Sequence, residues 1–290
     1  MTKLFLDYDA DALEREYLPL FWPDVNVQET IDTWLGWGEA YHQRADVRAE
    51  IMYGHSARQT LDLILPAANE APILVFIHGG YWRNRILDKK AYSFCSEPIV
   101  KAGALVAMVE YDLCPDVSMD ALVDQVRRAC SWLWRYAAKY GGDPTRLHVS
   151  GHSAGGHLAA MMAATDWTSF SDGLPADMVK SIIPISGLFE LEPLRLSSLN
   201  GDLRLDPDSA HRNSPRYLEP SARLPVSVVV GGVESNEFRR QSREFADAWT
   251  GMSVHMDYLE TPAHHHFTII EAMTEPENPL TATILRHLDL

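Results

Sequence analysis

A serine flanked by glycines is the feature of this sequence with the clearest chemical potential. The stretch Gly151–Gly155 reads Gly-His-Ser-Ala-Gly and so has the G-x-S-x-G pattern around Ser153. The segment Arg146–Ser150 before it predicts a strand, and the small residues of Ala154–Ala164 after it predict a helix. A strand, a sharp turn and a helix are the setting of a nucleophile elbow, in which the serine hydroxyl projects from the end of a sheet. We therefore predict that Ser153 is the nucleophile of an acyl-transfer reaction.

A glycine-rich turn about 70 residues earlier could stabilise the oxyanion that such a reaction forms. The stretch His78–Trp82 reads His-Gly-Gly-Tyr-Trp and follows a buried strand predicted over Ile73–Ile77. Glycines let a backbone approach a substrate closely and point its N–H groups at developing negative charge. We predict that the N–H groups of Gly80, Tyr81 and Ala154 form an oxyanion hole.

Candidates for the acid and the base follow the serine in the order that this chemistry expects on an α/β sheet. A strand predicted over Val226–Val230 is followed by a loop with two carboxylates, Glu234 and Glu237. Glu234 is nearer the strand and is favoured, whereas Glu237 is expected in the first turn of a helix, where a carboxylate complements the helix dipole. A strand predicted over Val254–Leu259 precedes three histidines, at 264–266, of which one need be catalytic.

Three consecutive histidines also raise the question of a metal site. Adjacent residues point in different directions, and the spacing of a helical histidine site is absent here. We therefore expect neither a metal ion nor another cofactor.

The elements that must position these residues alternate along the chain from about residue 50. Further strands are predicted over Ile51–Tyr53, Thr60–Leu65, Ala104–Glu110 and Ser181–Ser186, and further helices over Ser118–Tyr140, Glu237–Trp249 and Leu280–Leu288. Strands that alternate with helices indicate an α/β fold, with a mostly parallel sheet covered by helices on both faces. The active sites of such sheets lie at the carboxyl ends of their strands.

Two segments fall outside this alternation. Residues 1–50 carry apolar and aromatic side chains at helical spacing, so we expect a helical extension packed on a catalytic domain of residues 51–290. Its aromatic residues could cap a pocket or simply pack into the core. The irregular segment Gly187–Pro225 could form a lid or a surface for a homodimer.

Composition excludes several classes of protein. Of the 290 residues 46% are hydrophobic, which is ordinary for a globular protein. The net charge of −15 repels nucleic acids and anionic membranes. No apolar run approaches the roughly 20 residues of a membrane helix, and no export signal is evident. Three cysteines without a close pair fit reduced thiols, so a cytoplasmic location is expected.

Several of these motifs together resemble one family. His-Gly-Gly-x-Trp at 78–82, Gly-Gly-Asp-Pro at 141–144, Gly-His-Ser-Ala-Gly-Gly-His-Leu at 151–158 and Ile-Ser-Gly-Leu at 185–188 are similar to the kynurenine formamidase (arylformamidase) group of the α/β-hydrolase fold. The resemblance runs from about Tyr53 to Phe267. It implies that Ser153 is the nucleophile and that His266, directly before a phenylalanine, is the base. The group's acid is commonly aspartate, and here its position holds Glu234.

The resemblance implies hydrolysis of N-formyl-L-kynurenine to L-kynurenine and formate through an acyl-enzyme, with an aromatic small molecule as substrate. Tyr81 and Trp82 could then line a pocket for the aromatic leaving group, and Trp82 could equally pack into the core. A carboxylesterase or lactonase with the same triad is the nearest alternative, because one triad cleaves either kind of bond. A non-catalytic binding protein of this fold should have lost a member of the triad, and this chain has candidates for all three.

Overall fold

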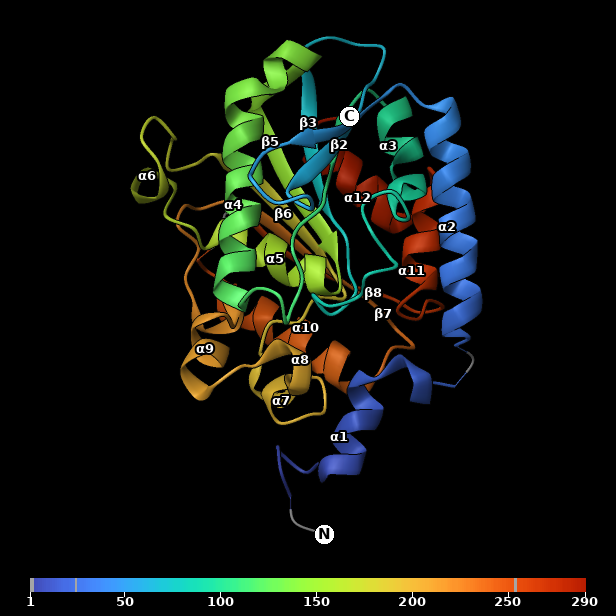
Figure 1. The fold of residues 1–290 in the computed structure, drawn as a ribbon, viewed down its shortest axis with the longest axis vertical. Helices are drawn as coiled ribbons and strands as arrows, with labels where there is room; N and C mark the ends of the chain where they lie inside the picture. Colours follow the sequence, from blue (N-terminus) through green and yellow to red (C-terminus); the bar gives the residue numbers. More distant parts are fainter. Residues whose placement is uncertain (1–2, 24, 253–254) are drawn as a thin grey trace.

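An eight-stranded β-sheet forms the centre of the computed structural model, which describes residues 3–23, 25–252 and 255–290 (Figure 1). The spatial order of its strands is β1-β2-β4-β3-β5-β6-β7-β8. Strand β2 is antiparallel to both of its neighbours, and the other pairs are parallel. The strands are β1 (Val47–Met52), β2 (Thr60–Ile64), β3 (Ala71–Ile77), β4 (Leu105–Val109), β5 (Gly142–His152), β6 (Val179–Ile185), β7 (Pro225–Gly231) and β8 (His255–Thr261). The predicted mostly parallel sheet is confirmed.

Helices cover both faces of this sheet. The α-helices are α1 (Ala10–Tyr17), α2 (Val27–Arg44), α3 (Glu97–Lys101), α4 (Met119–Tyr136), α5 (Ala154–Ala163), α6 (Trp167–Phe170), α7 (Glu192–Arg195), α8 (Asn200–Leu203), α9 (Pro207–Arg212), α10 (Asn236–Trp249), α11 (Thr268–Glu271) and α12 (Pro279–His287). Short 3-10 helices are η1 (Pro19–Phe21), η2 (Ser93–Ser96), η3 (Ala137–Tyr140), η4 (Pro215–Tyr217) and η5 (Ala272–Thr274).

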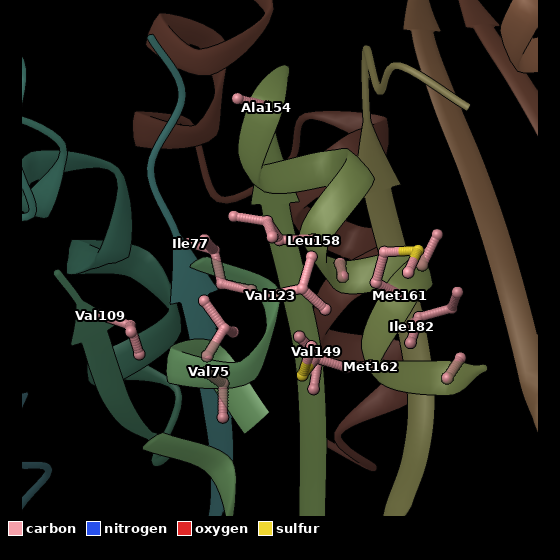
Figure 2. Close-up of a cluster of buried hydrophobic side chains, with 14 of the residues drawn as sticks. Val75, Ile77, Val109, Val123, Val149, Ala154, Leu158, Met161, Met162 and Ile182 are labelled. Atoms are coloured by element: carbon pink, nitrogen blue, oxygen red, sulfur yellow. The ribbon is translucent and has the colours of Figure 1, made fainter. Parts of the chain in front are cut away.

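The core has two parts, one on each face of the sheet. Strand β3 is buried along its whole length, and its successive side chains alternate between the two parts, because neighbouring residues of a strand point to opposite faces. Val75 and Ile77 join the first part, with α1 and the helices from α4 to α10, whereas Leu74 and Phe76 join the second, with α2, α3, α11 and α12. Figure 2 shows the first part, where valine, isoleucine and methionine side chains fill the space between the sheet and α4 and α5.

The parallel register brings the predicted site together at one edge of the sheet. Ile77, the last residue of β3, is paired with Gly151 near the end of β5, and Gly231 at the end of β7 is paired with Thr261 at the end of β8. The turns after these four strands therefore start at the same level. They carry the glycine-rich turn, Ser153, the two candidate carboxylates and the histidines.

Local sequence signals explain the element boundaries. The Ser118 side chain accepts a hydrogen bond from the Ala121 N–H and so begins α4. The helix predicted over Ser118–Tyr140 is α-helical to Tyr136 and continues as η3 up to Gly141, whose φ of 85° ends it. The strand predicted over Val254–Leu259 starts outside the described residues at Val254, and from His255 it is β8.

The described residues of the two segments expected outside the alternation form helices and one edge strand. Helices α1 and α2 of the N-terminal extension contribute to the two core parts, and β1 begins at Val47 and pairs with β2 at the edge of the sheet. The irregular segment 187–225 holds α7, α8, α9 and η4. None of the helices in the described part of the chain combines the length and apolarity needed to cross a membrane.

Candidate active site

Ser153 occupies a strained turn between β5 and α5. Its φ of 57° and ψ of −117° are unusual for a residue with a side chain, and its N–H donates a hydrogen bond of 2.8 Å to the Ile185 carbonyl. The turn is packed so tightly that a Cβ added at Gly155 would lie 1.9 Å from the Ile77 carbonyl oxygen. These are the steric demands of a nucleophile elbow.

The glycine-rich turn after β3 lies beside this elbow. Gly80, Tyr81 and Trp82 all have positive φ, of 110°, 51° and 54°. Gly80 and Tyr81 line one cavity together with Ser153. The N–H of Ala154, the residue after Ser153, is at the first position of α5, where helical geometry supplies no intrahelical partner. The three predicted oxyanion donors thus come from the turn after β3 and from the turn that holds Ser153.

A buried histidine anchors the glycine-rich turn to the neighbouring strand. The Nε2 atom of His78 lies 3.0 Å from Glu110 Oε1, and its ring stacks on Tyr111 with centroids 4.4 Å apart. The Tyr111 hydroxyl donates to the His78 carbonyl at 2.8 Å. Burial alone would raise the pKa of the Glu110 carboxyl, but His78 and Arg58 lower it to about 2. This support was not predicted, although the histidine of the His-Gly-Gly motif is a signal for it.

Glu234 and His266 form a buried pair on the other side of the serine. His266 Nδ1 lies 2.8 Å from Glu234 Oε2, and the two side chains are almost inaccessible. The second oxygen of Glu234 accepts hydrogen bonds from the Gly231 N–H at 2.7 Å and from the Ser186 hydroxyl. A Cβ at Gly231 would lie 2.3 Å from the backbone oxygen of His264, so glycine is required where the acidic and histidine loops meet.

Glu237, the other candidate acid, faces away from His266 into a separate network. Its two oxygens each lie 2.7 Å from the guanidinium of Arg240. The Tyr17 hydroxyl of α1 donates to it at 2.6 Å and accepts a hydrogen bond from Gln241 at 2.6 Å. Glu237 therefore connects α1 to α10 through the Tyr17 hydroxyl.

The remaining histidines near the site have separate surroundings. His265 Nδ1 accepts hydrogen bonds from the N–H groups of Phe267 and Thr268, at the start of α11. His152, next to the serine, has its ring 4.5 Å from that of His266 and its Nδ1 3.0 Å from the Tyr92 hydroxyl. Burial, together with the neighbouring His266, lowers the pKa of His152 well below the usual histidine value. Among the described residues no group of three His, Cys, Asp or Glu side chains could hold a metal ion.

A cavity of about 340 Å³ connects these groups. One of its walls belongs to the N-terminal extension, from η1 and the start of α2. The cavity is lined by Leu18, Pro19, Leu20, Val27, Ile31, Gly80, Tyr81, Arg83, Asn84, Leu87, Tyr92, His152, Ser153, His266 and Phe267. The extension therefore both caps the cavity and packs into the core, where Trp34 of α2 is fully buried. The indole of Trp22 also lies edge-on to the His266 ring, with centroids 5.4 Å apart.

The structure separates the two aromatic residues expected to contact substrate. Tyr81 lines the cavity, and its hydroxyl donates to the Tyr17 carbonyl; burial raises the pKa of Tyr81 well above its ordinary value, so it stays protonated. Trp82 packs into the core, the second of its two expected roles. Its indole is fully buried in the first part of the core, edge-on to His157 with centroids 4.9 Å apart, and does not line the cavity. Because the turn gives successive residues opposite directions, the tyrosine points to the cavity and the tryptophan to the core.

Comparison with known proteins agrees with this geometry. Residues 61–200 match the family model BD-FAE. The chain is 31% identical to a kynurenine formamidase of Danio rerio over 95% of each chain, and 30% identical to one of Salmo salar over 97% of each. The solved structure of a candidate thioesterase from Silicibacter sp. TM1040 superposes with a TM-score of 0.81 and 31% identity, over 94% of this chain and 98% of that one. The chain is thus a hydrolase of the α/β-hydrolase fold and belongs to the kynurenine formamidase family.

Proposed function

We propose that this protein hydrolyses N-formyl-L-kynurenine to L-kynurenine and formate with Ser153, His266 and Glu234 as its catalytic triad. The observation that carries the proposal is that an elbow serine and a carboxylate-bound histidine line the same cavity. Glu234 is one methylene longer than the aspartate that is common in this family. The loop accommodates this longer side chain, because the Gly231 N–H donates a hydrogen bond to the second carboxylate oxygen of Glu234.

The first half of the reaction forms a formyl-enzyme. Glu234 holds Nδ1 of His266, which leaves Nε2 to take the proton of the Ser153 hydroxyl as its oxygen attacks the formyl carbon. The N–H groups of Gly80, Tyr81 and Ala154 stabilise the resulting oxyanion. His266 then donates the proton to the aryl nitrogen, the C–N bond breaks, and L-kynurenine leaves.

The second half releases formate. Water enters, His266 removes one of its protons, and the hydroxide attacks the formyl ester of Ser153. Collapse of this second tetrahedral intermediate breaks the ester bond and returns the proton to Ser153.

The choice of an aryl formamide is supported by two observations. Nearly full-length relatives are kynurenine formamidases. The cavity is also of a size for a compound with one aromatic ring, and its wall is formed largely by apolar and aromatic side chains such as Ile31, Leu87, Tyr92 and Phe267.

Kinetics with matched substrates test this proposal. The wild-type protein should have a higher kcat/KM for N-formyl-L-kynurenine than for short p-nitrophenyl esters or thioesters. Ser153→Ala should lose hydrolysis and labelling by a fluorophosphonate probe, whereas Ser169→Ala, at an exposed serine of α6, should keep both. A kcat/KM that is larger for the esters by orders of magnitude, or wild-type turnover by Ser153→Ala, would refute it.

We also propose that the protein works in the cytoplasm. The support is its three cysteines, Cys95, Cys114 and Cys130, which are free and buried. Burial raises the pKa of the Cys130 thiol to about 12 and that of Cys114 to about 11, so both stay in the unreactive thiol form. Cell fractionation followed by immunoblotting tests the location, and recovery of the protein from a secreted or periplasmic fraction would contradict it.

A further inference from the structure

We infer that Arg83 binds the carboxylate of an amino-acid substrate, so that the cavity selects aryl formamides that carry a carboxylate. This inference rests on the proposed function and names the part of the substrate that the triad does not touch. Among the described residues that line the cavity, Arg83 is the one whose side chain carries a permanent charge. The other lining residues are apolar, aromatic or uncharged polar groups and two histidines.

The backbone places Arg83 in a fixed relation to the reacting atoms. It directly follows the turn Gly80–Trp82, and its own N–H donates a hydrogen bond of 3.1 Å to the Gly80 carbonyl. The same turn carries two of the proposed oxyanion donors. A substrate whose formyl oxygen lies at those donors is therefore bound in the same cavity that the Arg83 side chain lines.

The guanidinium of Arg83 has hydrogen-bond donors that its ion pair does not use. One of its nitrogens, Nη1, forms an ion pair with Asp202 of α8, and both side chains are 40% exposed. Ion pairs as exposed as this one are weak. In the described part of the chain no hydrogen bond engages Nε or Nη2 of Arg83, and these two atoms form the fork that binds a carboxylate through two parallel hydrogen bonds.

The charges of the protein also favour a role for Arg83 in substrate binding. The protein has a net charge of −15, so the carboxylate end of a zwitterionic amino acid needs a cation close to it at the binding site. A carboxylate that enters an otherwise uncharged cavity without a partner loses its hydration and gains nothing in return. N-formyl-L-kynurenine has its carboxylate on the side chain remote from the formamide, and Arg83 supplies the partner.

Two substrates that differ only in the carboxylate test the inference. N-formyl-L-kynurenine is compared with N-formylkynuramine, the same aryl formamide without that group. Arg83→Gln should raise KM for the first about tenfold, because it removes one charge-assisted pair, and should change kcat little. It should leave both constants for N-formylkynuramine near those of the wild type. Arg85→Gln, which removes a neighbouring exposed arginine outside the cavity, is the matched control and should behave as the wild type with both substrates.

Asp202→Asn separates carboxylate binding from a merely structural ion pair. If Arg83 binds substrate, loss of its competitor Asp202 should leave KM for N-formyl-L-kynurenine unchanged or lower. If the ion pair only holds the loop, Asp202→Asn should repeat the effect of Arg83→Gln, and that result overturns the inference. Equal losses by Arg83→Gln with both substrates, or no loss with either, also overturn it. A wild-type protein that hydrolyses neither formamide overturns the proposed function together with the inference.

Discussion

The buried His157 should make the protein lose stability as the pH falls from neutral. His157 of α5 is fully buried and its Nε2 donates a hydrogen bond of 2.8 Å to the Asn213 carbonyl. Burial lowers its pKa from 6.5 to about 4. Below pH 6.5 the unfolded chain therefore takes up a proton that the folded protein refuses until about pH 4. The stability that this histidine contributes is complete above pH 6.5 and is lost as the pH falls towards 4.

The size of the effect follows from the pKa difference. Each unit of pH between the two pKa values costs about 1.4 kcal/mol. Between about pH 7 and about pH 5, His157 alone should then lower the free energy of unfolding by about 2 kcal/mol. His157→Gln keeps a donor for Asn213 and removes the titration. Urea unfolding followed by circular dichroism should show that this variant loses about 2 kcal/mol less than the wild type between the two pH values.

A matched variant separates titration from packing. Trp82→Phe disturbs the same contact, since the indole lies edge-on to the His157 ring, but it leaves the histidine in place. It should lower stability at both pH values and keep the wild-type loss between them. If His157→Gln loses as much stability on acidification as the wild type, the burial of His157 does not keep its ring neutral and the reasoning fails.

Four further substitutions test individual contacts. Glu234→Gln should lower kcat by about 10³- to 10⁴-fold, because the amide no longer fixes the tautomer of the histidine. Glu237→Gln should keep kcat and lower the free energy of unfolding by about 3 kcal/mol. The reverse pattern in steady-state kinetics and urea unfolding would reassign the acid. Gly155→Ala should yield no folded protein, since its Cβ would meet the Ile77 carbonyl at 1.9 Å, and a soluble variant with native circular dichroism would contradict this. Tyr17→Phe should lower the free energy of unfolding by about 1–3 kcal/mol by leaving a buried donor unpaired, and an unchanged urea midpoint would refute the role of that hydroxyl.

Much of the fold could be predicted because its strands are short apolar segments bounded by clear stop signals. The strand over Ile73–Ile77 and the helix begun by Ser118 are found where they were expected. Local patterns do not carry pairing direction, so the antiparallel position of β2 was not predictable. The segment Gly187–Pro225 folds into single helical turns, which are too short to give a period in the sequence.

A candidate site residue could be predicted where the chemistry or the local turn demands one residue type. It could not be predicted where its role depends on the direction of its side chain. Ser153 could be predicted from the glycines around it, since only small neighbours fit the turn. The choice between Glu234 and Glu237 depended on which carboxylate faces the histidine, and a spacing of three residues on a loop that becomes a helix does not fix that. Trp82 shows the same limit, because the direction of a side chain after a turn of positive φ depends on backbone angles.

The contacts of the N-terminal extension join residues that lie far apart in the sequence. The Trp34 indole donates a hydrogen bond of 3.0 Å to Glu271, which lies 237 residues further along, and the Tyr17 hydroxyl binds Glu237 across 220 residues. During translation both aromatic residues leave the ribosome long before their partners exist. Helices α1 and α2 thus remain without these two hydrogen bonds until residues 237 and 271 have been made. A premature stop before Glu271 would therefore remove the partner of the Trp34 indole, and a stop before His266 would also remove the histidine that the Trp22 indole packs against.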